Sequence, residues 1–163
     1  IKNSKFYTMF VLFIIFLIIT SIWDALDGRL ARVLCKTSRF CNYLDALIDR
    51  YVEIIIFFGF ALAGFHIEAF LVISGSLVVS YAKARTAIIA QVENHGWPTI
   101  GERIDRLVLL VIGMMISLFL PTITILEFTV TTISFFLYLI AIVVYVGSIQ
   151  RIFYAKKIIK EKK

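Results

Sequence analysis

The stretch DALDGRLARVLCKTSRFCNYLDALID, from Asp24 to Asp49, holds four aspartates, three arginines and one lysine directly after a long apolar run. That run, FYTMFVLFIIFLIITSIW at residues 6–23, is close to the ~20 residues with which a helix crosses a bilayer. Apolar residues resume from about residue 45. The stretch therefore joins the end of one expected membrane span to the start of the next, and its charges gather at one face of the membrane.

The composition indicates an integral membrane protein. The 163 residues are 61% hydrophobic and only 17% charged, whereas a soluble domain of this length needs more polar surface. Two prolines and eight glycines favour long helices. The sequence lacks the alternation of polar and apolar residues over ~10-residue segments that marks a membrane barrel. We therefore expect an all-α fold.

Five apolar runs are long enough to cross a bilayer as helices. They cover residues 6–23, about 45–65, about 69–90, 107–126 and about 128–150. Pro121 falls near the end of the fourth run, and short, nearly uncharged connections precede the third and the fifth. We expect a polytopic transmembrane helical bundle that occupies residues 1–163 as one domain.

The basic residues give this bundle a sidedness. When the helices are threaded alternately through the membrane, every lysine and arginine except Lys2 and Lys5 falls on one side, which the positive-inside rule makes cytoplasmic. The N-terminus then lies outside, and the chain begins with Ile1 rather than Met. We expect one further helix upstream and six spans in the full protein. Basic residues beside anionic headgroups account for part of the net charge of +6 without a nucleic-acid partner.

The four aspartates form two pairs with helical spacing. Asp24 and Asp27 share a helix face at the end of the first span, and Asp45 and Asp49 share a face at the start of the second. A hairpin between the two helices would bring the pairs together, where four carboxylates repel one another. Divalent metals relieve that repulsion, and two hard ions such as Mg²⁺, Mn²⁺ or Ca²⁺ suit four carboxylates.

Ordinary helix-end charges are the alternative interpretation. The macrodipole favours Asp45 and Asp49 near a helix start, but it disfavours Asp24 and Asp27 near a helix end, so a functional site is the better explanation. Gly28 allows a ligand to approach the backbone closely. Cations among the aspartates favour a phosphate or pyrophosphate ligand. They are Arg29, Arg32, Lys36 and Arg39.

The same stretch resembles the signature of the CDP-alcohol phosphatidyltransferase family, D-x2-D-G-x2-A-R-x8-G-x3-D-x3-D. The matching residues are Asp24, Asp27, Gly28, Ala31, Arg32, Asp45 and Asp49. One fixed position differs, because Cys41 stands where the family has its second glycine. Cysteine is small and apolar enough to be tolerated there, but its side chain still takes space beside the nucleotide.

The resemblance implies a six-helix membrane fold and transfer of a phospho-alcohol group from a CDP-alcohol to a second alcohol, with release of CMP. It implies two Mg²⁺ or Mn²⁺ ions held by Asp24, Asp27, Asp45 and Asp49. It implies a cytidine-diphosphate site that includes Asp24, Gly28, Ala31, Arg32 and Cys41. Asp49 would also act as the base that accepts the proton of the acceptor hydroxyl. Members of the family form dimers, so a homodimer is expected by resemblance.

Two further basic clusters are candidates for binding the acceptor. Lys83 and Arg85 end the third apolar run, and Arg103 and Arg106 precede the fourth. Cations near the membrane that face a bundle interior are functional candidates, and together these four could clamp a phosphate. The alternative is plain positive-inside anchoring. Both clusters resemble the branch of the family that uses inositol phosphate, with glycerol 3-phosphate as the other phosphorylated acceptor and either a CDP-lipid or CDP-inositol as donor.

Other classes of function stay open. A divalent-cation transporter could use the aspartates as ligands, but transport sites lie near the bilayer midplane, whereas these carboxylates lie at one membrane face among arginines. An inactive membrane scaffold, marked by Cys41, is the other alternative. Glu53 follows Asp49 by one helical turn and could orient Arg50 or contribute to the site.

Overall fold

The computed structural model describes residue 15 and residues 39–90, 100–125 and 128–161. The expected first span, apart from Ile15, lies outside these residues. So does the first part of the aspartate motif, with Asp24, Asp27, Gly28, Ala31 and Arg32. The described helices begin at Arg39.

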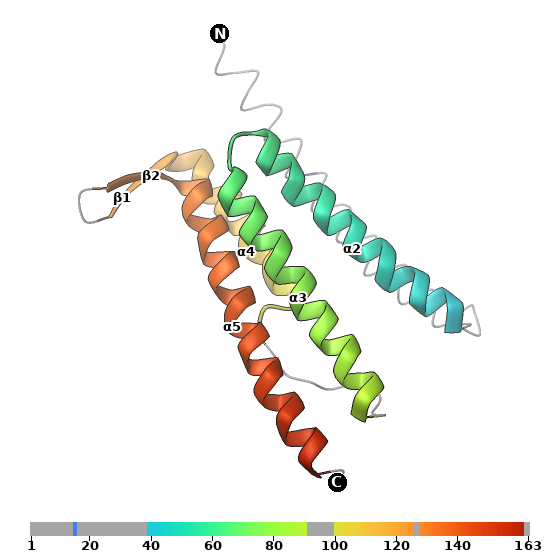
Figure 1. Ribbon diagram of the computed structural model, residues 1–163. Coiled ribbons are helices and arrows are strands. Elements are labelled where there is room, and N and C mark those ends of the chain that lie inside the picture. The colour runs from blue at the N-terminus through green and yellow to red at the C-terminus, as the bar shows by residue number, and fades with distance from the viewer. Residues whose placement is uncertain (1–14, 16–38, 91–99, 126–127, 162–163) are drawn as a thin grey trace.

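Four helices and a two-stranded sheet make up the described part of the chain. In order they are α2 (Arg39–Leu62), α3 (His66–Ala90), α4 (Arg103–Phe119), β1 (Thr122–Ile125), β2 (Phe128–Thr131) and α5 (Thr132–Glu161). Helix α3 lies between α2 and α5, and α4 packs against α5 (Figure 1). Apolar side chains from all four helices form the core, among them Phe57, Val72, Leu110, Leu137 and Val144.

The turn between α2 and α3 is shorter than the sequence suggested. Gly64 has a φ of +106°, and the amides of Gly64 and Phe65 donate to the carbonyls of Ala61 and Phe60, both at 3.0 Å. This pattern is a Schellman motif, in which a glycine in the left-handed region ends a helix. Because α3 begins at His66, part of the expected connection is helical.

A β-hairpin between α4 and α5 corrects the all-α prediction. Helix α4 ends at Phe119 rather than near residue 126, two residues before Pro121. Threonine, isoleucine and valine fill the segments TITI and FTVT, and β-branched residues favour extended backbone over helix. The strands pair antiparallel from Thr122 opposite Thr131 to Ile125 opposite Phe128. The fold is thus mostly helical, with a short sheet at one end.

Two helices of the described part are long and apolar enough to cross a membrane, over His66–Ile89 and Thr132–Lys160. Helix α4 is shorter, at 17 residues, and α2 carries four charged residues between Asp45 and Glu53. Helix α5 continues to Glu161, well past the expected end near residue 150. The helical bundle is therefore confirmed in outline, while the number of five spans stays a prediction.

The segment that leads into α4 lies directly on α5. A Cβ atom added at Gly147 would come within 2.0 Å of the Ile100 carbonyl oxygen, so only glycine allows this approach. The amide of Ile100 donates to the Gln150 side chain at 3.2 Å. Gly101 follows with a φ of +84°. The start of α4 is thereby fixed against α5, next to the polar pocket described below.

Candidate active site

A pocket of about 590 Å³ lies where α2, α3, α5 and the start of α4 meet. Its charged lining residues are Asp49, Arg50, Lys83, Glu102, Arg103, Arg106 and Arg151. Five of these seven are cationic, and apolar side chains such as Leu47 and Leu77 complete the wall. An excess of positive charge in a partly enclosed pocket suits a ligand with several negative charges.

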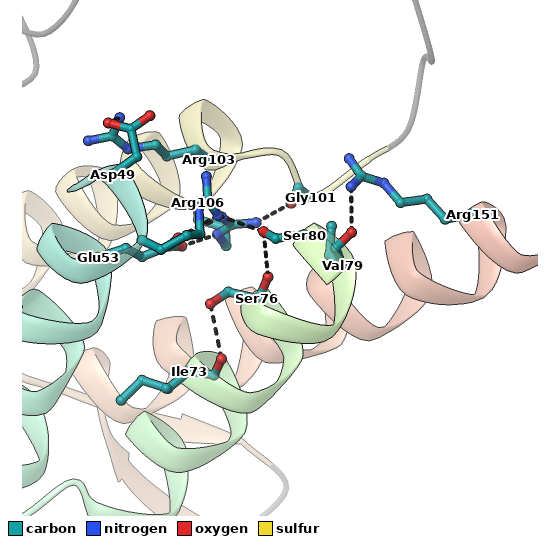
Figure 2. Close-up of polar contacts among 11 residues, drawn as sticks. Asp49, Glu53, Ile73, Ser76, Val79, Ser80, Gly101, Arg103, Arg106 and Arg151 are labelled. Carbon is teal, nitrogen blue, oxygen red and sulfur yellow. Dashed lines mark hydrogen bonds and ion pairs between the residues drawn. The ribbon is translucent and has the colours of Figure 1, made fainter. Parts of the chain in front are cut away.

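The most deeply buried charges beside the pocket are Glu53 and Arg106. Their exposed fractions are 2% and 1%. Arg106 Nη2 donates to Glu53 Oε2 at 2.9 Å, and Arg106 Nε donates to the other carboxylate oxygen (Figure 2). Arg106 Nη1 donates to the Gly101 carbonyl. Buried charges are tolerated only with such partners, so Arg106 links α2 to the turn before α4.

Arg50 adds helix α3 to the same network. Its Nη1 atom donates to Glu53 Oε2 at 2.9 Å and to Ser80 Oγ at 2.8 Å. The Ser80 hydroxyl in turn donates to the Ser76 carbonyl at 2.9 Å. Glu53 therefore contacts two guanidinium groups, and the contact with Arg50 is the one that the sequence suggested.

The aspartates of α2 have different surroundings. Asp49 forms an ion pair with Arg103 and lines the pocket, with about a quarter of its side chain exposed. Asp45 lies one turn earlier, is exposed, and is not among the lining residues. The four-residue spacing from Asp45 through Asp49 to Glu53 puts all three carboxylates on one side of α2.

Asp45 and Asp49 are the described residues of the expected ligand set for divalent metals. In residues 39–90, 100–125 and 128–161, with residue 15, no group of three or more His, Cys, Asp or Glu side chains could hold a metal. Asp45 and Asp49 nevertheless supply the hard carboxylate oxygens that Mg²⁺ and Mn²⁺ prefer. They fit half of the expected ligand set, and the other half, Asp24 and Asp27, lies outside the described residues.

On the α5 side of the pocket, Glu102 lies between two cations. Its Oε1 atom is 3.7 Å from Lys83 Nζ and 3.4 Å from Arg151 Nη2. Arg151 is 4% exposed at its side chain, and its Nη1 atom donates to the Val79 carbonyl at 2.7 Å. The sequence analysis did not assign Arg151 to the site. Its available signal was a cation directly after a long apolar run, and a cation in such a place is a functional candidate by default.

The start of α4 is capped in a way that fixes its basic residues. The Asp105 carboxylate accepts from the amides of Gly101 and Glu102 at 3.0 and 3.1 Å. Such capping satisfies amide groups that have no partner inside the helix. Arg103 and Arg106 are three residues apart, so both project from one face of the capped turn toward α2.

The structure brings together three of the four residues expected to bind the acceptor. Lys83, Arg103 and Arg106 line the pocket, whereas Arg85 is exposed and is not among the lining residues. Two residues along a helix correspond to a rotation of ~200°, which places Lys83 and Arg85 on different faces. Cys41 belongs to the first turn of α2, but its side chain lies outside what the structure describes.

These features define a helical protein with a cation-lined pocket beside an aspartate-bearing helix, and comparisons with known proteins define its family. Residues 5–155 match the model of the CDP-alcohol phosphatidyltransferase family. The chain belongs to this family, whose members are CDP-alcohol phosphotransferases.

Two curated relatives are named as synthases of an inositol phosphate lipid. The chain is 36% identical over 147 residues to the archaetidylinositol phosphate synthase of Pyrococcus horikoshii, an alignment that covers 88% of this chain and 69% of the relative. It is 39% identical over 99 residues to the phosphatidylinositol phosphate synthase of Streptomyces avermitilis, over 53% of this chain. The chain spans only 38% of the length of that second relative.

Crystal structures of the Mycobacterium tuberculosis phosphatidylinositol phosphate synthase share the fold. The structure with CDP-DAG bound matches with a TM-score of 0.63 and 25% identity, over 83% of this chain and 68% of that chain. The structure in complex with manganese and citrate matches with a TM-score of 0.64 and 25% identity, over 83% and 65% of the two chains.

Proposed function

We propose that this chain forms the catalytic part of a membrane enzyme that transfers a phospho-alcohol group from a CDP-linked lipid to inositol 1-phosphate and releases CMP. The observation that carries the proposal is a pocket lined by five cations that opens beside Asp49, the last aspartate of the family motif. The names of the curated relatives support an inositol phosphate as acceptor.

The donor binds at the aspartate motif. Asp24, Asp27, Asp45 and Asp49 hold two divalent ions, Mg²⁺ or Mn²⁺. Gly28, Ala31, Arg32 and Cys41 contact the cytidine diphosphate. When bound, the ions neutralise the pyrophosphate and stabilise the charge of the departing CMP. The Mycobacterium tuberculosis structures with CDP-DAG and with manganese support this half of the proposal.

The acceptor binds on the other side of Asp49, with its phosphate on the basic wall formed by Lys83, Arg103, Arg106 and Arg151. Guanidinium groups match phosphate oxygens in charge and geometry. Arg85 is included in the proposed clamp only because of its place in the sequence. In the structure its side chain is exposed and does not line the pocket. Glycerol 3-phosphate shares the phosphate group and is the second candidate acceptor.

Asp49 is the base of the reaction. Its carboxylate accepts the proton of the acceptor hydroxyl, and the hydroxyl oxygen forms a bond to the phosphorus that carries the donor's alcohol group. The bond from that phosphorus to the bridging oxygen of the pyrophosphate breaks, and CMP leaves with the electron pair. Arg103, which pairs with Asp49 in the structure, holds this carboxylate at the mouth of the pocket.

We further propose that the enzyme lies in the cell membrane as a homodimer, with the pocket on the cytoplasmic side. The basic residues of the pocket favour this side through the positive-inside rule. The two long apolar helices, α3 and α5, support a membrane location.

The test is CMP release by the purified protein with CDP-diacylglycerol and one acceptor at a time. We expect release with inositol 1-phosphate, loss of release with EDTA, and recovery with Mg²⁺ or Mn²⁺. Glycerol 3-phosphate, serine and free inositol complete the acceptor panel, and CDP-inositol is the second donor. Activity only with serine or free inositol would contradict a phosphate-binding pocket. Metal flux without CMP release would favour a transporter, and neither activity would favour a scaffold.

A further inference from the structure

We infer that Glu53 is a positioning residue for the acceptor side of the pocket. It holds Arg106 and, through Arg106, the turn that carries Glu102 and Arg103, without touching the substrate itself. The kinetic part of this inference rests on the proposed function, whereas its binding part does not.

Glu53 lies at the junction of three helices. Its carboxylate on α2 accepts from Arg106 of α4 and from Arg50, which also donates to Ser80 of α3. Glu53 is 2% exposed and is not among the residues that line the pocket. A carboxylate in that place acts on the pocket only through the two arginines.

Arg106 connects Glu53 to the backbone of the turn before α4. Arg106 donates to the Gly101 carbonyl, and the next two residues, Glu102 and Arg103, both line the pocket. Gly101 itself has a φ of +84°, and a Cβ atom there would lie 3.0 Å from the Val143 carbonyl oxygen on α5. The turn is therefore held between Arg106 on one side and α5 on the other.

A role in positioning the two arginines explains the burial of Glu53 better than a contribution to protein stability does. A buried ion pair roughly breaks even against an apolar replacement, so stability alone gives little reason to bury a glutamate between two arginines. A charge that orients neighbouring groups is a better explanation, because both arginines that Glu53 contacts line the pocket. The backbone positions of Asp45 and Asp49 are set by helix α2, whereas the Asp49 side chain also pairs with Arg103 at the start of α4.

The experiment uses Glu53→Gln, which keeps the shape and removes the charge, and Glu53→Asp, which keeps the charge on a shorter side chain. Glu68→Gln is the matched control. Glu68, in the first turn of α3, accepts from Ser134, in the first turn of α5, at 2.5 Å and does not line the pocket. Each protein is purified in detergent, and only the single species on size exclusion is measured. The two readouts are thermal stabilisation by inorganic phosphate and the separate KM values for donor and acceptor.

We expect Glu53→Gln to raise the acceptor KM about 10- to 100-fold, the range typical of residues that orient a binding group. Its donor KM should stay within about twofold of the unmodified protein, a change below ~0.4 kcal/mol. Phosphate should stabilise the unmodified protein and Glu68→Gln but not Glu53→Gln, and Glu53→Asp should fall between. If Glu53→Gln does not fold, Glu53→Asp carries the test. Failure of both to fold would instead assign Glu53 a structural role.

The outcomes separate this inference from the proposed function. Normal phosphate stabilisation and an unchanged acceptor KM in a folded Glu53→Gln protein would overturn the positioning role and leave the enzyme intact. A fall in kcat with both KM values unchanged would overturn it as well. An unmodified protein that is stabilised by phosphate, with the stabilisation lost in Glu53→Gln, but that releases no CMP would overturn the proposed function and retain the positioning role.

Discussion

Two of the sets of ion pairs that border the pocket differ strongly in their exposure to solvent. Glu53 and Arg106 are almost completely buried, and their carboxylate and guanidinium groups meet in two hydrogen bonds. Glu102 is 45% exposed, and its distances to Lys83 and Arg151 are 3.7 and 3.4 Å. A buried pair fixes the backbone that it joins, whereas an exposed pair is weak and exchanges easily for water or another anion. The Glu53–Arg106 pair therefore fixes the turn before α4, whereas the Glu102 side chain on that turn can exchange its partners for a ligand.

The pair with intermediate exposure, Asp49 with Arg103, gives the largest expected effect. Asp49→Asn keeps the shape of the side chain and removes its ability to accept a proton. We expect CMP release to fall by about a hundredfold to ten-thousandfold, the contribution of a general base. The measurement is kcat at saturating donor and acceptor, with Glu68→Gln as the control for loss of a carboxylate elsewhere. Full activity in Asp49→Asn would remove Asp49 from the mechanism.

The buried and the exposed pair should separate clearly in stability. Arg106→Gln removes the main partner of Glu53, and we expect a loss of about 3 kcal/mol in the free energy of unfolding. This value is at the lower end of the range for breaking a buried pair, because Arg50 still contacts Glu53. Lys83→Gln at the exposed pair should cost less than about 1 kcal/mol. Thermal unfolding of both variants measures the difference. Equal losses of unfolding free energy would contradict the expected contrast between the buried and the exposed pair.

The position of the turn before α4 also depends on the contact between Gly147 and the Ile100 carbonyl. Gly147→Ala places a methyl group where the oxygen lies 2.0 Å away, so the turn before α4 must move. We expect a loss of about 1–3 kcal/mol, as for other overpacked sites, together with a higher acceptor KM. Gly59→Ala is the matched control, since nothing lies within 4 Å of its Cβ position. Equal stability of the two variants would contradict the contact.

A change at the exposed Glu102 side chain should give the smallest effect, and it should strengthen rather than weaken acceptor binding. Glu102→Gln removes a negative charge that competes with the acceptor phosphate for Lys83 and Arg151. We expect the acceptor KM to fall by about two- to fivefold, the strength of a weak exposed ion pair, with kcat unchanged. Inorganic phosphate should inhibit the variant at lower concentration than the unmodified protein. A higher acceptor KM would instead make Glu102 part of the acceptor site.

The sequence predicted the class of the fold and much of the pocket because both follow from local patterns. Apolar runs predicted the helices, and the two basic clusters with Lys83, Arg85, Arg103 and Arg106 predicted a shared phosphate clamp. The pocket lining includes all of these residues except Arg85. The spacing of Asp45 and Asp49 predicted a shared face. The hairpin was missed because residues 122–131 are as apolar as a span end, although their β-branched side chains favour strands.

The sequence could not predict contacts between residues far apart in the chain. Glu53 pairs with Arg106 across 53 positions, and Arg151 reaches the Val79 carbonyl across 72. The sidedness predicted from the basic residues places all of these residues at one end of the bundle, but it does not predict which helix faces meet. Arg85 shows the limit, because it lies on the correct side and yet outside the pocket lining.

The contribution of α5 to the pocket has a consequence for synthesis. Arg151, the Gly147 contact and the Gln150 side chain all come from this helix, which is the last described element of the chain to leave the ribosome. Contacts between distant segments form late because their loop-closure entropy must be overcome first. The earlier helices can insert and pack without a finished pocket. Anion binding at this pocket would then begin only when α5 docks against the earlier helices.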